Sequence, residues 1–415
     1  MRRLRVVFLI ENMSFPRDPR VRREAAALQQ AGWDVSVVSP KGADHDSRMF
    51  EAIDGAKVYR YWQPWRGKSI LGYLLEYGWA MAWTFALTCW IAATDGFEVL
   101  HAGNPPDLFC LIGFPFRLLG KQFVFDQHDL CPELLASRLQ GARGLRSLVC
   151  LFERWSYRLA NLVIVTNQSA YDIALVRGAS EGRLCVVRNG PELDSLSDAE
   201  VRPQLREGAE FLALYAGHIS PQDGVDRVVK AAHYIAHIRG RRDIMFAILG
   251  EGDSVRELRQ LVRSLHLEPF VGFCGWVQGA DFHSYLATAD VCLSPEPPED
   301  FNQWSSFIKL TDYMSYGKVT VCFDVLESRR TLGPAGVFVE RDDAALFGDA
   351  ILRVLDDPDG RRELGAIAAT RLRSSFHWGL SRRALLDAYE TVIREGSLLS
   401  AGEASDAVPA AWREN

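Results

Sequence analysis

Short apolar runs alternate with helix-forming segments along most of this chain, and the alternation starts twice. Parallel strands buried on both faces are near-continuous apolar runs joined by helices, so the pattern predicts two doubly wound α/β sheets. Asn189-Gly190-Pro191 and a polar stretch up to Glu210 separate the two series. The predicted strands are 4–10, 33–39, 57–62, 99–102, 122–126, 162–166 and 184–187, then 211–215, 245–249, 270–273, 291–294, 319–323 and 337–339.

This break divides the chain into two domains of similar size. We predict a Rossmann-like domain over 1–190, a linker over 191–210 and a second Rossmann-like domain over 211–378. A chain of 415 residues, 48% of them hydrophobic, is long enough for two or three cores. Residues 399–415 are small and polar, and we expect a disordered tail there.

Composition argues against several classes of protein. The net charge of −6 disfavours general nucleic-acid binding, which requires a basic surface. The eight cysteines are scattered without a CxxC pair, which is typical of buried thiols in a reducing compartment and not of disulfides or zinc ligands. The apolar run before Glu11 predicts a first strand, because it is too short for a signal peptide. The chain lacks GxxxxGK[ST], which excludes a P-loop, and has no GxGxxG after its first strand.

Residues 77–94 form an apolar segment without a charge, at the lower limit of length for crossing a bilayer. Trp79, Trp83 and Trp90 fall near one helical face, but core packing and interfacial anchoring both produce such a stripe. Three interpretations fit this segment. It is a core helix of the first domain, which we favour, a helix lying on a membrane surface, or a membrane span, which the borderline length disfavours.

In open α/β sheets, ligands bind beyond the carboxyl ends of the strands, so the residues that follow the strands are candidate site residues. The stretch 302–324 combines a polar loop, a helix, a turn and a buried strand. We predict that Ser305 and Ser306 cap a helix over 307–316 and that Gly317 ends it.

Lys309 and Asp312 lie three residues apart within the first turns of this helix. The free N–H groups of a helix N-terminus, with the Ser306 hydroxyl, favour an anion. Lys309 can then hold a phosphate oxygen, and Asp312 can accept from sugar hydroxyls. The alternative is that these two residues form a surface ion pair without a ligand.

Three other loops carry candidate residues. His128 and Asp129 follow a strand directly, where the histidine can donate to a sugar or phosphoryl group and the acid can fix its tautomer. The alternative is that Asp129 caps a helix and His128 has no role. Gly217 and Gly250 each follow a strand, where glycine permits a close approach to a diphosphate, although many such turns carry a glycine for packing alone.

Seven segments resemble, in order, those of glycosyltransferase family 4: HAGNPPDL, FDQHDLCPEL, VVRNGP, YAGHISPQDGVD, ILGEGDS, FCGWV and IKLTDYMSYGKVTV. Their order and spacing over nearly the whole chain carry the resemblance. The family has the GT-B fold, two Rossmann-like domains facing across a cleft, and transfers a sugar from a nucleoside diphosphate donor with retention. The resemblance also implies that a final helix, 379–398, crosses back onto the first domain, and that no metal or other cofactor is bound.

The resemblance assigns roles to individual residues. His128, with Asp129 beside it, would act at the donor sugar. Lys309 and the Ser306 end of the helix would hold the diphosphate, and Asp312 would accept from the ribose. Residues 273–277 would flank the nucleobase. The implied donor-binding residues are Gly217, His218, Gly250, Phe273, Glu296, Ser306, Lys309 and Asp312.

Several positions depart from the family's pattern. His218 and Asp223 stand where many members have Arg and Lys, which removes two cations from the diphosphate site. Trp304 and Asp312 stand where two glutamates are usual, and Val319 stands where proline is common. Lys309, or first-domain arginines such as Arg17 and Arg20, would then have to supply the charge.

The first hypothesis is a divergent, retaining glycosyltransferase of surface-polysaccharide synthesis. It would be cytoplasmic and act on a glycan or polyprenyl-linked acceptor, with peripheral contact at the inner face of the membrane through residues 77–94. The second is a nucleotide-sugar 2-epimerase of the same fold, with Asp129, Glu133 and Glu296 as its carboxylates, although the segment order fits a transferase better. The third is a catalytically silent partner protein, which the departures support.

Overall fold

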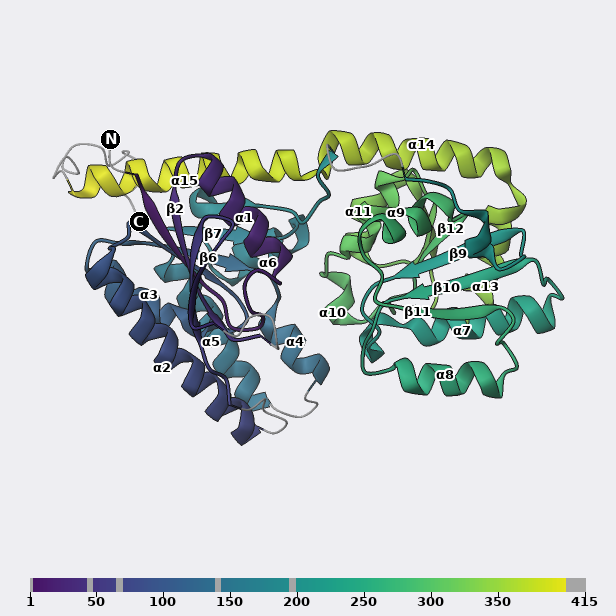
Figure 1. Cartoon of the computed structure of the whole chain (residues 1–415), viewed down its shortest axis with the longest axis horizontal. Coiled ribbons are helices and arrows are strands. Elements are labelled where there is room, and N and C mark those ends of the chain that lie inside the picture. Colours follow the sequence, from purple (N-terminus) through teal and green to yellow (C-terminus); the bar gives the residue numbers. More distant parts are fainter. Residues whose placement is uncertain (1–2, 43–47, 65–69, 139–142, 194–198, 401–415) are drawn as a thin grey trace. The chain divides into compact units, whose positions relative to one another are not determined.

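The computed structural model describes residues 3–42, 48–64, 70–138, 143–193 and 199–400. By its internal contacts the chain divides into two compact units (Figure 1). Unit 1 combines Met1–Val187 with Arg382–Asn415, and unit 2 is Arg188–Ser381. Each unit contains a parallel sheet with connecting helices, so the predicted pair of Rossmann-like folds is confirmed.

Unit 1 contains a sheet that, within the described residues, has eight strands in the order β3-β4-β2-β1-β5-β6-β7-β8. Neighbouring strands are parallel except β3 and β4, an antiparallel hairpin whose turn is Asp54 and Gly55, both with positive φ. The sequence pattern did not predict β3. The strands are β1 (Arg5–Leu9), β2 (Asp34–Pro40), β3 (Phe50–Ile53), β4 (Ala56–Tyr61), β5 (Val99–Gly103), β6 (Gln122–Gln127), β7 (Leu162–Val165) and β8 (Leu184–Val186).

The two faces of this sheet have different surroundings. The chain moves in one direction from β1 to β2 and in the other from β4 through β8, so right-handed crossovers place α1 on one face and α2, α3, α5 and α6 on the other. The apolar core lies on the second face, where Phe123 and Phe125 meet Phe116 and Tyr157. The helices are α1 (Pro19–Gln30), α2 (Ile70–Thr94), α3 (Cys110–Leu118), α4 (Cys131–Arg138), α5 (Arg143–Leu159) and α6 (Gln168–Arg177).

The helix α2 contains the apolar segment 77–94, and it is not a core helix. Its buried stripe is narrow and includes Ala80, Thr84, Thr88 and Ile91, whereas Trp90 is 62% exposed. The interpretation that we favoured from the sequence is therefore wrong for most of the helix surface. Among the described helices, none is both long enough and apolar enough to cross a membrane.

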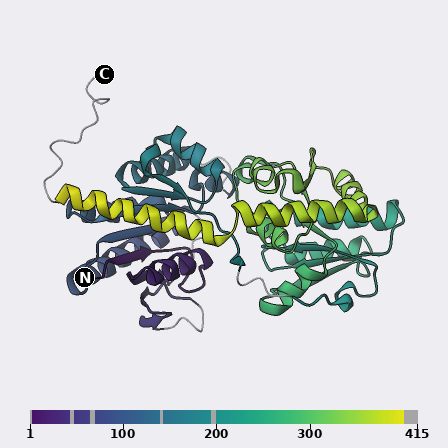
Figure 2. The same cartoon turned by 90° about the horizontal axis from the view of Figure 1, so that it is seen from above.

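The helix α15 (Trp378–Ser400) begins with the last residues of unit 2 and continues along unit 1, as Figure 2 shows. Its Tyr389 packs edge-on against Trp33, which follows α1. The predicted tail starts at 399, but Leu399 and Ser400 still belong to this helix, and 401–415 lie outside the described residues.

Unit 2 has, within the described residues, a six-stranded parallel sheet in the order β11-β10-β9-β12-β13-β14. The strands are β9 (Phe211–Ala216), β10 (Ile244–Leu249), β11 (Val271–Gly275), β12 (Val291–Ser294), β13 (Thr320–Phe323) and β14 (Gly336–Val339). The helices are α7 (Val225–His233), α8 (Val255–Ser264), α9 (Gly279–Thr288), α10 (Asp300–Gln303), α11 (Ile308–Ser315), α12 (Leu326–Leu332), α13 (Ala344–Asp356) and α14 (Pro358–Ser375).

The stretch 191–210, which we expected to be a linker, lies within unit 2. Its residues 199–210 are described, and they pack on that unit: the Arg206 guanidinium donates to both oxygens of Asp290 at 3.1 Å, and the Arg202 amide donates to Thr288. The division between the units falls after Val187 and again after Ser381.

Candidate functional site

The helix α11 of unit 2 is held at the carboxyl ends of two strands by Tyr313. Its hydroxyl accepts from the Ala216 amide at 2.9 Å and donates to the Leu293 carbonyl at 3.2 Å. The helix starts at Ile308 with Phe307 as its N-cap residue, so the predicted caps at Ser305 and Ser306 are wrong. The Ser305 hydroxyl instead donates to the carbonyl of Phe301, in the preceding turn.

Lys309, in the first turn of α11, is buried, with 9% of its side chain exposed. Its ammonium forms an ion pair with Glu296, lies 3.2 Å from the Tyr215 hydroxyl and sits 4.5 Å from the centre of the Tyr215 ring. Burial alone would lower the pKa of Lys309, but Glu296, together with Tyr313 and Asp223, outweighs burial and raises it. Lys309 is therefore a buried cation, which argues against the surface ion pair considered from the sequence.

The loops after β9 and β10 meet at Lys309. A Cβ placed on Gly217 would lie 2.9 Å from Cε of Lys309, so only glycine leaves the lysine its present position. Gly250 has a φ of 133°, and a Cβ there would overlap the Gly217 carbonyl oxygen. The Gly217 amide donates to Leu249 at 3.0 Å, which fixes the two loops together. The structure thus brings Gly217, Gly250, Glu296 and Lys309 into one place.

The loop after Gly217 is held by the side chain of Asp223 and by the backbone of His218. Asp223 accepts from the Ser220 amide at 2.9 Å in a capping box, and burial raises its pKa. The His218 side chain is exposed, while its carbonyl accepts from the Tyr215 hydroxyl at 2.6 Å. The departure at 223 thus has a structural explanation, whereas nothing in the structure explains the histidine at 218.

Three other predicted donor-binding residues lie near these loops. Phe273 lies on β11, partly buried against the core, with the Arg259 guanidinium 5.1 Å from its ring centre. Ser306 is exposed just before α11, and Asp312 is half-buried one turn beyond Lys309.

A second polar centre lies in unit 1, beneath α1. Arg20 of α1 donates to both oxygens of Asp126 on β6, at 2.8 and 2.6 Å, and to the Val187 carbonyl at 2.7 Å. Arg20 is also 3.2 Å from Glu24, one turn further along α1. Because Arg20 is buried and bound in this way, our suggestion that it supplies charge to a diphosphate is wrong.

His128 takes its orientation from Asp126. Its Nε2 lies 2.6 Å from Oδ2 of Asp126, and 12% of its side chain is exposed. Burial alone would lower the pKa of His128, but Asp126 raises it above its ordinary value, which favours the imidazolium. Arg20 and His128 hold the pKa of Asp126 well below its usual range in spite of burial. The acid that positions His128 is therefore Asp126 and not, as we expected, Asp129.

Asn104 holds the loop that carries His128. Its Oδ1 accepts from the amides of His128 and Asp129 at 2.6 and 3.1 Å, and its Nδ2 donates to the Asp129 carbonyl and to Asp107 at 2.8 Å. The backbone of Asp129 thus helps to fix this loop through its two hydrogen bonds with Asn104. Sequence reasoning missed Asn104 as a functional residue, although it lies in the HAGNPPDL segment.

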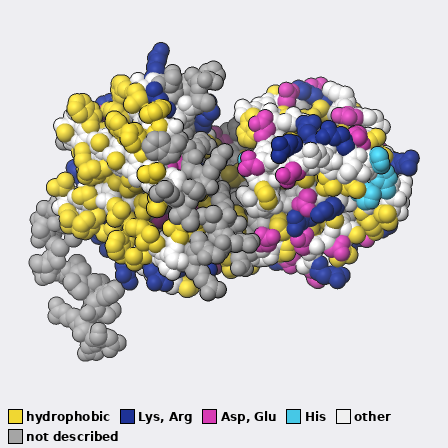
Figure 3. All heavy atoms as spheres, turned by 90° about the horizontal axis from the view of Figure 1, so that it is seen from below, with side chains coloured by type: hydrophobic (Ala, Val, Ile, Leu, Met, Phe, Trp, Pro, Cys, Tyr) yellow, Lys and Arg dark blue, Asp and Glu magenta, His cyan; other side chains and the backbone are white. Residues whose placement is uncertain are grey.

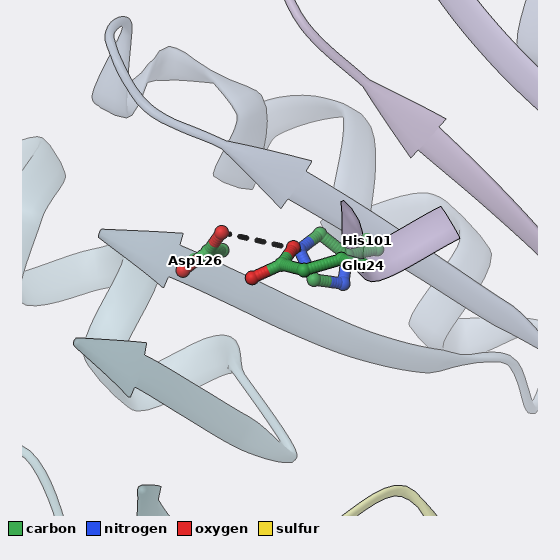
Figure 4. A group of neighbouring side chains, drawn as sticks. All are labelled: Glu24, His101 and Asp126. Carbon is green, nitrogen blue, oxygen red and sulfur yellow. Dashed lines mark ion pairs between the residues drawn. The ribbon is translucent and has the colours of Figure 1, made fainter. Parts of the chain in front are cut away.

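Glu24, His101 and Asp126 converge in this centre (Figure 4), and their nearest ligand atoms lie within 4.8 Å of one another. Such a set can hold a metal ion, but here the Arg20 guanidinium already pairs with two of its members. Burial raises the pKa of Glu24 to about 8 and lowers that of His101, so both favour their neutral forms near pH 7. The Arg20 guanidinium thus occupies the position that a metal ion would take among these side chains, so we assign no metal to this centre.

A surface cavity of about 580 Å³ in unit 2 lies elsewhere and contains none of the predicted site residues. It runs between the end of β14 and α13, and its lining carries both arginines and acids. Arg239, for example, is paired with Asp349. We therefore place the site at the loops around Lys309 and not in this cavity.

Comparison with known proteins identifies matches in both units. Residues 18–190 match the family described as "Glycosyl transferase 4-like domain", and residues 210–357 match "Glycosyl transferases group 1". A D-inositol 3-phosphate glycosyltransferase of Pseudarthrobacter chlorophenolicus is 26% identical over 242 residues, 56% of each chain. This match therefore spans about half of that relative's length. A glycogen synthase of Mycobacterium tuberculosis is 25% identical over 374 residues, 86% of each chain.

Solved structures show the same fold. A sucrose-phosphate synthase from Thermosynechococcus elongatus aligns with a TM-score of 0.77 at 20% identity, over 95% of this chain and all of the other. Anabaena HepE in complex with UDP-glucose aligns with a TM-score of 0.66 at 15% identity, over 94% of this chain and all of the other.

Proposed function

Because the chain belongs to glycosyltransferase family 4, with its GT-B fold, we propose that it moves a sugar from a nucleoside diphosphate donor to a glycan or lipid-linked acceptor. The configuration at the anomeric carbon is retained in this proposal, and no metal ion takes part. Solved relatives of similar fold hold UDP or UDP-glucose, which supports a nucleotide-sugar donor.

The buried cation Lys309 is the observation that carries this proposal. A leaving nucleoside diphosphate develops negative charge that fixed donors must stabilise. Lys309 stands in the first turn of α11, where helix N–H groups also favour an anion, and Gly217 lets the end of Lys309 pack against the loop after β9. Binding the diphosphate requires Lys309 to share its charge between Glu296 and the ligand.

His128 has the properties required near the donor sugar. As an imidazolium it is a donor at both ring nitrogens, so with Nε2 on Asp126 its Nδ1 can donate to a sugar oxygen. In this proposal the acceptor hydroxyl attacks the anomeric carbon on the face from which the diphosphate leaves, and the departing phosphate takes the hydroxyl proton. No side chain then serves as a nucleophile.

We place the reaction in surface-polysaccharide synthesis, in the cytoplasm at the inner face of the membrane. The exposed tryptophans of α2 support contact with a lipid surface. An epimerase would need free carboxylates at the sugar, but Glu133 is bound to Arg177 at 2.6 Å and Glu296 to Lys309. This pairing favours the transferase over the epimerase.

A thermal-shift panel of UDP, GDP, ADP and TDP with their sugar conjugates tests the proposal. A ligand that binds only the folded state at a hundred times its Kd stabilises the protein by about 2.7 kcal/mol. We expect one nucleotide to raise Tm selectively, and Lys309→Ala and Asp312→Ala to abolish the shift. Conversion of the free donor into its epimer would support the epimerase, and no shift with any nucleotide would support a silent partner protein.

A further inference from the structure

One face of unit 1 exposes large apolar side chains over three helices. Figure 3 shows the gathering of hydrophobic side chains on this unit. Phe85 of α2 packs near Phe116 of α3, and α3 in turn contacts α5, so the three helices are neighbours. We call the exposed side of these helices the three-helix face; its large apolar residues are Leu74, Leu75, Trp83, Phe85, Trp90, Leu111, Phe114, Leu118, Leu119, Leu148, Leu151 and Trp155.

The buried side of α2 includes two threonines, whereas Trp83, Phe85 and Trp90 lie on its exposed side. Thr84 and Thr88 are fully buried, and the Thr88 hydroxyl donates to the Thr84 carbonyl at 2.6 Å. Trp83 and Trp90 lie on the exposed side. A helix that faces only water carries the opposite arrangement, because exposed apolar area is unfavourable. The outer side of α2 is therefore suited to an apolar partner.

The exposed charges on the three-helix face are all positive. Among the described residues of α2, α3 and α5, the exposed charged side chains are Arg146, Arg154 and Arg158, all on α5, while Glu76 and Arg117 are half-buried. Arg146 lies 3.9 Å from Glu133, which leaves Arg154 and Arg158 as the arginines tested below. Glu153, between them in sequence, is buried and paired with Arg177. A second copy of the same face would bring like charges together, whereas an anionic surface complements them.

We propose that the three-helix face docks on the surface of an anionic lipid bilayer. Tryptophan and arginine suit such a boundary, since the indole ring lies at headgroup depth and the guanidinium reaches the phosphates. The helices lie in the interface and do not cross it. The docking itself does not depend on the proposed function. Only its advantage rests on that function, because docking would bring unit 1, the acceptor-side unit, close to a lipid-linked acceptor.

Vesicle co-sedimentation of the full chain tests this docking. The probes are vesicles of equal parts phosphatidylglycerol and phosphatidylcholine, and vesicles of phosphatidylcholine alone. We expect binding to the first, weakened by salt, and much weaker binding to the second. Trp83→Glu with Trp90→Glu lowers the partition constant more than about tenfold. Arg154→Glu with Arg158→Glu lowers it by at least about fivefold for each arginine.

The matched control is Ile238→Glu, which places the same charge at an apolar residue of unit 2 that is 67% exposed. It leaves vesicle binding unchanged if the proposal holds. Absence of binding to anionic vesicles overturns the proposal, and so does equal weakening by Ile238→Glu. A concentration-dependent dimer that Trp83→Glu with Trp90→Glu dissociates, without vesicle binding, also overturns it, because the face would then join two copies.

The nucleotide thermal shift separates this inference from the proposed function. The face variants are expected to retain the shift of the wild-type protein, which also shows that they fold. Vesicle binding without any nucleotide shift contradicts the proposed function alone, and a nucleotide shift without vesicle binding contradicts the docking alone.

Discussion

The hydroxyl of Tyr389, on α15, lies 2.6 Å from Nδ1 of His101 on β5. Both side chains are fully buried, and His101 in turn lies 3.5 Å from Glu24 and from Asp126. The position of α15 is thus tied to the polar centre that orients His128.

Tyr389→Phe removes this hydroxyl and leaves Nδ1 of His101 buried without its partner. Because the ring and its contact with Trp33 remain, we expect a loss of about 1–3 kcal/mol in the free energy of unfolding, measured by urea denaturation. Tyr59→Phe is the control, since its hydroxyl is 3.4 Å from Asp95 near the surface and its loss is expected to stay within about 0.5 kcal/mol. Equal losses in the two variants would contradict the assignment.

Glu24 makes stability depend on pH. Its pKa is raised by burial from 4.5 to about 8, so the folded state keeps a proton that the unfolded state releases. This contribution is fully present below pH 4.5 and is lost as the pH rises to about 8. Glu24→Gln has no such titrating group, so this loss is absent from the variant. The difference in unfolding free energy between Glu24→Gln and the wild type is therefore expected to shift in favour of the variant between pH 5 and 8. Glu200→Gln, at an exposed acid, should show no such trend.

Gly217→Ala and Gly250→Ala distinguish a glycine that makes room for the Lys309 side chain from one that is required by the backbone conformation. The new Cβ at 217 meets the flexible end of Lys309, so we expect a folded protein whose nucleotide affinity falls about tenfold, measured by titration calorimetry. The new Cβ at 250 meets backbone at a φ of 133°, so we expect a loss of at least about 2 kcal/mol in stability. The reverse pattern would show that Lys309 does not hold the nucleotide.

Lys309→Met leaves Glu296 buried and unpaired, with 1% of its side chain exposed. Breaking such a pair costs about 3–5 kcal/mol of unfolding free energy. Adding Glu296→Gln removes the unpaired charge, so the double variant is expected to recover most of the stability. It should still lack nucleotide binding, because the cation is absent. Recovery of binding in the double variant would overturn the role of Lys309.

His128→Ala is expected to lower kcat/KM by about 10²–10³, because an oriented imidazolium is lost. Asp129→Asn should lower it by less than about tenfold, since Asp126 holds the His128 ring. The raised pKa of His128 keeps it charged to a pH above its ordinary 6.5, and kcat/KM should decline as the pH rises through that raised pKa. A wild-type profile that lacks this decline would contradict the assignment.

The two sheets and the loops at their carboxyl ends could be predicted because both follow from local patterns. Apolar runs bounded by turn residues specify buried strands, and parallel strands place their ends at one edge. Gly217, Gly250, Glu296 and Lys309 all follow strands or lie in the helix after β12, and the structure brings them together.

The polar centre of unit 1 could not be predicted, because its contacts join distant parts of the chain. Arg20 and Asp126 are 106 residues apart, and nothing in either local segment specifies the other. The orientation of α2 was also hidden, since a helix that is apolar on nearly all sides has no stripe to show which side faces the sheet. Ser305 was predicted to cap α11, but its hydroxyl donates to the Phe301 carbonyl of the preceding turn.

The return of α15 to unit 1 sets an order on synthesis. Unit 2 is continuous, so all of its residues have been translated once Ser381 is made. Unit 1 still lacks Tyr389 at that moment, so His101 lacks the Tyr389 hydroxyl until α15 emerges from the ribosome. The half of the chain that is made first is therefore completed last, because the contact between Tyr389 and His101 forms only after all of unit 2 has been translated.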